Sequence, residues 1–229
     1  DKAALFKTAM KQIAHRHGLS VTFMAKWNAD LPGASGHLHQ SLWRGKKNAF
    51  HDPAAPRGMS LVMQRYLAGQ LSLMQELTAM ISPTVNSYKR YVPGVWAPLV
   101  ASWGVENRTC ALRVIGLGQP EVMRIEHRQS AADMNAYLAM AAALGSGLWG
   151  IENQLELGPE TLGDSGSEGP NRLPRNLNQA TDLFAQSKAA RELFGAEFVD
   201  HYRRTREWEV RCSERAVTDW ELRRYFEAI

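Results

Sequence analysis

The stretch GASGHLHQSLW, residues 33–43, places two histidines one residue apart directly after a glycine-containing turn. In an extended strand the side chains of His37 and His39 would point to the same face, and Leu38 to the other. Glycines such as Gly33 let the backbone come close to a ligand. The histidine pair could bind a metal, contact a phosphate, or be ordinary polar strand residues. The stretch alone leaves these interpretations open.

The composition is that of an ordinary globular protein of 229 residues, 45% hydrophobic and 22% charged. The 27 basic and 23 acidic residues give a net charge of +4, too weak and scattered to indicate nucleic-acid binding. No apolar run reaches membrane-spanning length, and the first residues do not resemble a signal peptide. The two cysteines, Cys110 and Cys212, form no CxxC pattern. We therefore expect a cytoplasmic protein without membrane contact.

Helical and strand-like patterns alternate along the chain, which predicts the α+β class. The first half is expected to contain a helix over 3–17, a strand over 21–27, and a long helix from Ser60 to about Ile81. Strand-like pieces follow within 85–128. The rest is expected to contain a closely packed Ala- and Gly-rich helix capped by Asp133, a polar loop over 157–176, and three helices. The last of these opens with a capping box made by Thr218 and Glu221.

The segment RIEHR, residues 124–128, repeats the alternation seen in the histidine stretch. Arg124, Glu126 and Arg128 would share one face of a strand, and Ile125 and His127 the other. One interpretation is a surface ladder of ion pairs, worth roughly 0–1 kcal/mol. The other is a carboxylate that binds a divalent ion, with guanidinium groups holding phosphate or carboxylate beside it.

Further arginines occur on short strands and turns between residues 86 and 113. NSYKRYVPG contributes Arg90, and NRTCALR contributes Arg108 and Arg113. Together with the histidine pair and Glu126, five arginines favour a charged site that binds anions. Several arginines with a metal are what phosphoryl transfer uses to neutralise developing charge. No Walker-type loop or GxGxxG is present, which disfavours a P-loop or Rossmann scaffold.

These motifs, in this order, resemble the C-terminal part of the glutamine synthetase catalytic domain. The pattern is GxxxHxHxSL, NSYKRxVPGxxAP, NRxxxxR, RxExR and an NxYLA helix, and it covers nearly the whole chain. The resemblance implies a curved, mostly antiparallel sheet, or half-barrel, with helices packed outside it and a helical C-terminal segment. Residues 1–229 would form an incomplete catalytic domain, with a β-grasp domain and the first catalytic strands preceding it. Such a fragment alone is expected to be inactive.

The resemblance also implies roles for individual residues. Mg²⁺ or Mn²⁺ would be bound by His37 and Glu126. ATP would be bound by His39, Ser41, Arg108, Arg113 and Arg124, and Arg108 would also contact the transferred phosphoryl group as a catalytic residue. Glutamate would be bound by Gly33, Arg90 and Arg128.

The family reaction joins glutamate to an amine in two steps. ATP phosphorylates the γ-carboxylate, and ammonia or another amine then attacks the acyl phosphate. A carboxylate becomes a good electrophile only when one of its oxygens has been made a leaving group. Arginines and Mg²⁺ offset the repulsion between the two anionic reactants. The resemblance further implies a ring-shaped homo-oligomer.

The chain departs from the family pattern at three positions. Trp96 stands where the family has a flap glutamate that binds ammonium and helps deprotonate it. An indole can hold a cation by its face and offers an apolar wall, but it cannot accept a proton. Trp96 therefore favours an amine other than ammonia, unless it is a simple packing residue. Pro32 replaces an asparagine that helps hold glutamate, and Glu121 stands about where a lysine is expected.

Two other function classes compete with the ligase. A non-catalytic scaffold or regulatory relative would keep the fold without turnover, but the complete set of charged residues argues against decay of the site. An unrelated metal hydrolase built on the histidine pair would need further acidic or histidine ligands near it and no arginine array. The sequence shows the opposite.

Overall fold

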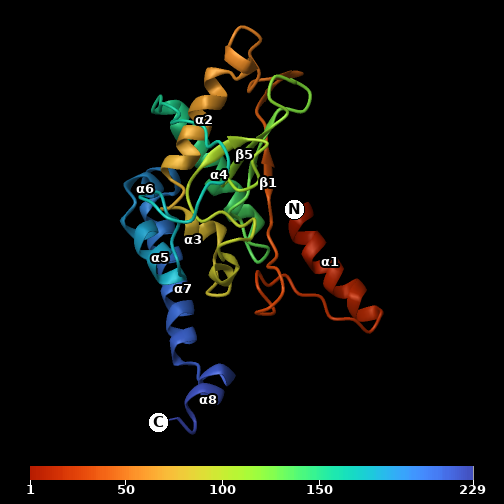
Figure 1. Cartoon of the computed structure of the whole chain (residues 1–229), viewed down its shortest axis with the longest axis vertical. Coiled ribbons are helices and arrows are strands. Elements are labelled where there is room, and N and C mark those ends of the chain that lie inside the picture. The colour runs from red at the N-terminus through yellow and green to blue at the C-terminus, as the bar shows by residue number, and fades with distance from the viewer. Residues whose placement is uncertain (229) are drawn as a thin grey trace.

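The computed structural model describes residues 1–228 and has the α+β architecture that the sequence predicts (Figure 1). The strands are β1 (Leu38–Gln40), β2 (Trp43–Arg44), β3 (Lys47–Asn48), β4 (Trp103–Val105), β5 (Leu112–Ile115) and β6 (Arg124–His127). The α-helices are α1 (Lys2–Arg16), α2 (Leu61–Ser72), α3 (Thr78–Ile81), α4 (Ala136–Glu152), α5 (Leu177–Gln186), α6 (Lys188–Phe194), α7 (Ala196–Arg215) and α8 (Asp219–Tyr225). Two 3₁₀ turns, Pro56–Gly58 and Ser87–Arg90, complete the elements. None of the helices described is both long and apolar enough to cross a membrane.

Four strands form the central sheet, in the order β1-β6-β5-β4. The pairs β1–β6 and β5–β6 are antiparallel and β4–β5 is parallel, so the sheet is mixed, with two of its three strand pairs antiparallel. Within residues 1–228 the sheet is neither curled nor closed. β2 and β3 form a separate hairpin. The register places Glu126 of β6 between His39 of β1 and Arg113 of β5, which brings residues from three separate motifs together.

The two faces of this sheet differ in chemistry because the side chains alternate along each strand. Leu112, Val114 and Ile125 are fully buried and pack against apolar side chains of α2, among them Met63 and Leu67. The other face carries the charged residues of β5 and β6. The sheet is therefore anchored by one face and presents its charges on the other.

Helix α4 packs very closely across α2, as its Ala- and Gly-rich sequence predicts. A Cβ atom added at Gly147 would lie 2.2 Å from a ring carbon of Tyr66, and one at Gly69 would lie 2.2 Å from the carbonyl oxygen of Ser146. Only glycine fits at such contacts. A second core, formed by α3, α5 and α7 around Leu77, Phe184 and other buried residues, continues from α2 and α4 toward the C-terminus.

Several local predictions are confirmed. Ser60 caps α2 by accepting a hydrogen bond from the Met63 amide at 3.1 Å. Thr218 and Glu221 form the predicted capping box of α8. The first helix also forms, but Figure 1 shows α1 set to one side of the sheet, and its Leu5 and Phe6 side chains are exposed.

Other local predictions are wrong. Residues 21–27 form no strand, and the Lys26 amide donates to the side chain of Asn86 instead of to a neighbouring strand. The long helix breaks after Ser72, and its second part survives only as α3. Four helices, not three, follow the polar loop.

The cap of α4 is also misplaced by the sequence prediction, because Asn135 provides it in place of Asp133. The Asp133 carboxylate accepts hydrogen bonds from the hydroxyls of Thr84 and Ser87 instead. These bonds fix the start of the turn that carries Arg90. Asp133 therefore stabilises the turn that carries Arg90 and does not cap a helix.

Candidate active site

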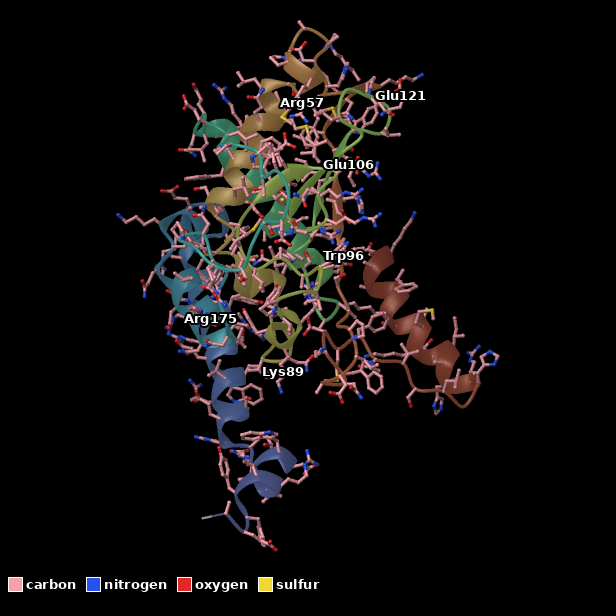
Figure 2. All side chains as sticks on the ribbon, in the orientation of Figure 1. Arg57, Lys89, Trp96, Glu106, Glu121 and Arg175 are labelled. Carbon is pink, nitrogen blue, oxygen red and sulfur yellow. The ribbon has the colours of Figure 1, made fainter. Side chains whose placement is uncertain are left out.

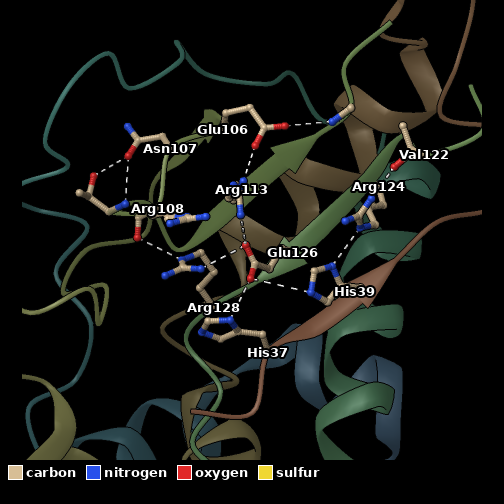
Figure 3. A network of polar contacts seen from close by, with 12 residues as sticks. His37, His39, Glu106, Asn107, Arg108, Arg113, Val122, Arg124, Glu126 and Arg128 are labelled. Carbon is tan, nitrogen blue, oxygen red and sulfur yellow. Dashed lines mark hydrogen bonds and ion pairs between the residues drawn. The ribbon is translucent and has the colours of Figure 1, made fainter. Parts of the chain in front are cut away.

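The two histidines of the opening stretch converge on one carboxylate (Figure 3). His37 Nδ1 lies 2.8 Å from Oε1 of Glu126, and His39 Nε2 lies 3.8 Å from the same oxygen. His39 faces Glu126 directly across the β1–β6 register, and His37 precedes β1 by one residue. The predicted shared face of the histidines is therefore confirmed, and it lies over Glu126.

Glu126 is a buried carboxylate, 5% exposed, held by two arginines in addition to the histidines. Its Oε2 lies 3.1 Å from Nη1 of Arg128 and 3.3 Å from Nη1 of Arg113. Burial raises the pKa of Glu126, but Arg128, His37 and Arg113 outweigh it, so the pKa is lowered overall. The surface-ladder interpretation of this motif is wrong, because Glu126 and Arg128 are both buried.

His37 is expected to be uncharged at neutral pH. Burial lowers the pKa of its imidazole, the charge of Arg128 lowers it further, and Glu126 only partly opposes these effects. A neutral imidazole and an ionised carboxylate are the forms that bind metal ions.

The donor atoms of His37 and Glu126 suit a divalent metal ion. Two donors bound side by side on Mg²⁺ at about 2.1 Å lie roughly 3 Å apart, close to the 2.8 Å between His37 and Glu126. No group of three or more His, Cys, Asp or Glu side chains suited to a metal occurs within residues 1–228. Mg²⁺ is often held by one or two carboxylates together with water and substrate phosphates. His37 and Glu126 therefore fit part of a metal site.

Glu106 also holds Arg113, on the side away from Glu126. The sequence motifs did not predict a role for this residue. The Glu106 carboxylate forms an ion pair with Nη2 of Arg113 and accepts the Gly116 amide hydrogen bond at 3.1 Å (Figure 3). Glu106 has a φ of 52°, a left-handed conformation that non-glycine residues seldom adopt. Glu106 directly precedes the NR motif, and this is the one sequence signal that points to it.

Arg124 and Ser41 lie near His39, at the end of the sheet that β1 forms. Arg124 Nε donates to Nδ1 of His39 at 3.1 Å. The Ser41 hydroxyl accepts the indole N–H of Trp43 at 2.9 Å. His39 and Ser41 also line a cavity of about 350 Å³ between β1 and α4, with Tyr66 at its wall. These residues, predicted to contact the nucleotide, are thus grouped at the β1 edge of the sheet.

A second cavity of about 350 Å³ gathers the residues predicted to bind glutamate. It is lined by residues from the opening turn, the Arg90 turn and the segment 95–97 (the flap segment), and by the residue directly after β6. These residues are Pro32, Gly33, Ser35, His37, Arg90, Val95, Trp96, Ala97 and Arg128. A Cβ atom at Gly33 would lie 2.6 Å from Cγ of Arg90, so only glycine lets the turn approach this arginine. Arg90 itself is buried, donates to the carbonyl of Gln129 and lies over the Tyr91 ring at 4.9 Å.

Trp96 stands at the mouth of this cavity and is 65% exposed, so it is no core packing residue. The guanidinium of Arg108 lies 5.5 Å from the centre of its ring. Arg128 ties the two segments together, because its Nη2 donates to the Trp96 carbonyl at 3.3 Å and its Nε to the Arg108 carbonyl at 3.1 Å. By contrast, Figure 2 shows Glu121 on an outlying loop away from Trp96, and it takes no part in this site.

Comparison with known proteins agrees with this arrangement. The family model described as "Glutamine synthetase, catalytic domain" matches residues 1–225. The chain belongs to the glutamine synthetase family. It is 44% identical to Type-1 glutamine synthetase 2 of Dictyostelium discoideum, over 100% of this chain and 45% of that protein. It is also 44% identical to Gamma-glutamylethanolamide synthetase GlnA4 of Streptomyces coelicolor, over 99% of this chain and 48% of that protein.

A solved structure described as a GmaS/ADP complex matches with a TM-score of 0.87 and 32% identity, over 98% of this chain and 53% of that one. The chain thus spans about half the length of the relatives it matches. This glutamine synthetase family domain is similar both to glutamine synthetases and to ligases named for other amines.

Proposed function

We propose that the chain is the C-terminal catalytic part of a cytoplasmic, ATP-dependent ligase that joins the glutamate γ-carboxylate to an amine other than ammonia. The observation that carries this proposal is the cavity shared by Arg90, Arg128 and Trp96. Two buried arginines provide positive charge for the two carboxylates of glutamate. At the cavity mouth stands an exposed indole, which cannot attract ammonium as a carboxylate does. The relative named for ethanolamide synthesis supports a substrate of this kind.

In the first step the glutamate γ-carboxylate oxygen attacks the terminal phosphorus of ATP, and ADP leaves. Arg90 and Arg128 hold the amino acid, and Gly33 lets the backbone of the opening turn approach it. Arg108, next to the flap, balances charge on the moving phosphoryl group. The nucleotide would extend from the β1 edge, which carries His39 and Ser41, across the charged face of the sheet, where Arg124 of β6 and Arg113 of β5 would contact it.

A divalent ion, Mg²⁺ or Mn²⁺, would be held in part by His37 and Glu126 and would neutralise phosphate charge. In this role the arginines around Glu126 hold its carboxylate ionised and oriented toward His37. In the second step the neutral amine nitrogen attacks the acyl carbon, the bond between that carbon and the phosphate oxygen breaks, and the departing phosphate takes up the proton that the nitrogen loses.

The longer protein is proposed to contain further strands that complete a half-barrel with this open sheet, and to assemble as a ring-shaped homo-oligomer. The rival proposal is a non-catalytic scaffold of the same family. The tight network around Glu126 argues against it, because an inactive site has no need for a buried carboxylate shared by two arginines and a histidine.

The test is an assay of ADP release by the full-length protein with glutamate, Mg²⁺ or Mn²⁺, and a panel of ammonia, ethanolamine, isopropylamine and diamines. We expect ADP release that depends on both glutamate and an organic amine, with ammonia a poorer substrate. Absence of ADP release with every amine would support the scaffold. A clear preference for ammonia would refute the proposed substrate class.

A further inference from the structure

The flap segment 95–97 lines two cavities. One is the cavity that contains Arg90 and Arg128. The other has a volume of about 210 Å³ and is lined by 93–97, Leu99, Thr109 and the loop 164–167. Trp96 therefore borders both the predicted glutamate cavity and a second cavity to which the proposed function assigns no role.

The two cavities differ in charge. Among the described residues that line them, Asp164 in the second cavity provides the one carboxylate. The first cavity contains Arg90 and Arg128, and Arg108 lies against the Trp96 ring. A positively charged amine that approaches this region meets several cations, and Asp164 is the group placed to offset them.

Asp164 is fixed in place because its loop is bonded to the turn that carries Arg108. The Ser165 amide donates to Oγ1 of Thr109 at 3.0 Å, and the Ser165 hydroxyl donates to the Thr109 carbonyl at 2.7 Å. The Asn107 side chain donates to the Gly163 carbonyl at 2.6 Å. These bonds hold the loop on residues 107–109, directly beside the residue predicted to contact the transferred phosphoryl group.

We propose that this second cavity is the subsite that captures the amine substrate as its ammonium form. The Asp164 carboxylate pairs with a primary ammonium, and Trp96 packs against the carbon attached to it. A water molecule occupies about 30 Å³ in the liquid, so the cavity holds about seven water-sized groups and suits a short amine. The inference rests on the proposed ligase function and adds to it the class and size of the second substrate.

The test compares the wild-type full-length protein with Asp164→Asn, which keeps an oxygen able to accept the Gly166 amide hydrogen bond that Asp164 Oδ1 accepts at 2.7 Å. With glutamate and ATP saturating, we expect the KM for ethanolamine to rise about fivefold, the scale of one exposed charge pair. The KM values for glutamate and ATP should stay within about twofold. Asp182→Asn, an exposed carboxylate on α5, is the matched control and should leave the KM for ethanolamine unchanged.

Hydroxylamine separates charge recognition from damage to the loop, because it is uncharged at neutral pH. Its KM should be the same for wild type and Asp164→Asn. An unchanged KM for ethanolamine in an active Asp164→Asn variant overturns the subsite and leaves the ligase function intact. An equal rise for ethanolamine and hydroxylamine also overturns it. A wild-type protein that turns over no amine overturns both proposals, since the subsite then has no substrate to serve.

Discussion

Replacing Trp96 by glutamate should move the amine preference toward ammonia. The change removes a ring that lies 5.5 Å from the Arg108 guanidinium, an exposed contact worth about 0.5–1 kcal/mol. It introduces a carboxylate at the mouth of a cavity whose lining carries Arg90 and Arg128 and no acid among the described residues. That carboxylate can attract ammonium, and it also removes the apolar wall that an alkyl group would contact.

The size of the effect follows from the apolar contact that only the organic amine makes. A carboxylate at position 96 attracts ammonium and the ammonium form of ethanolamine alike, so its Coulomb gain largely cancels in the ratio of the two substrates. Loss of the indole wall costs each CH2 group of ethanolamine about 0.8 kcal/mol at full burial, and less at position 96, which is 65% exposed. We therefore expect about 1 kcal/mol, which is roughly a fivefold rise in the ratio of kcat/KM for ammonia to kcat/KM for ethanolamine.

The assay measures both kcat/KM values on the same preparation, so that any general loss of activity cancels in the ratio. Trp96→Phe keeps an apolar wall without a charge and should leave the ratio within about twofold of wild type. If the ratio for Trp96→Glu equals that for Trp96→Phe, the residue at position 96 does not select the amine and the reasoning is refuted.

Three further predictions concern the supporting structure. Glu106→Gln weakens the ion pair that holds Arg113, so ADP binding measured by calorimetry should weaken about threefold to tenfold; unchanged affinity would contradict this role. Gly147→Ala forces a Cβ against the Tyr66 ring and should destabilise the fold by about 2 kcal/mol, seen as a lower thermal midpoint. Burial raises the pKa of Tyr202 to about 12 from its ordinary 10.0, so the unfolded chain releases this proton first and stability falls as pH rises through that window. Tyr202 contributes up to about 3 kcal/mol of this loss between about pH 9 and about pH 12 in urea unfolding, and the loss should be smaller by that amount in Tyr202→Phe, where only the other buried tyrosines such as Tyr66 still contribute.

Strand alternation gave the most reliable part of the sequence analysis. The period of two along β6 correctly placed Arg124, Glu126 and Arg128 on one face, because β6 lies between two strands and has one apolar core to face. Short local signals also held, as at Ser60, because a cap depends only on residues within one turn.

Predictions that depend on distant partners failed. The apolar pattern of 21–27 fits a strand, but a strand forms only with a neighbour to bond with, and none among the described residues is present. The apolar run after Ser72 is buried on all sides in two cores, so its periodicity could not reveal the break before α3. The role of Glu106 depends on its ion pair with Arg113, a residue of another strand, and the local sequence around Glu106 does not indicate this partner.

The charges of the site create a problem for the amine that the flap alone does not solve. Glutamate and ATP are anions, and Arg90, Arg108 and Arg128 suit them. The same field repels a substrate that arrives as a cation, and Glu126 is already occupied by Arg128 and His37. With Trp96 at the flap, the carboxylate that balances this repulsion has to come from another segment. The loop bonded to residues 107–109 supplies one in Asp164, which lines a cavity together with Trp96.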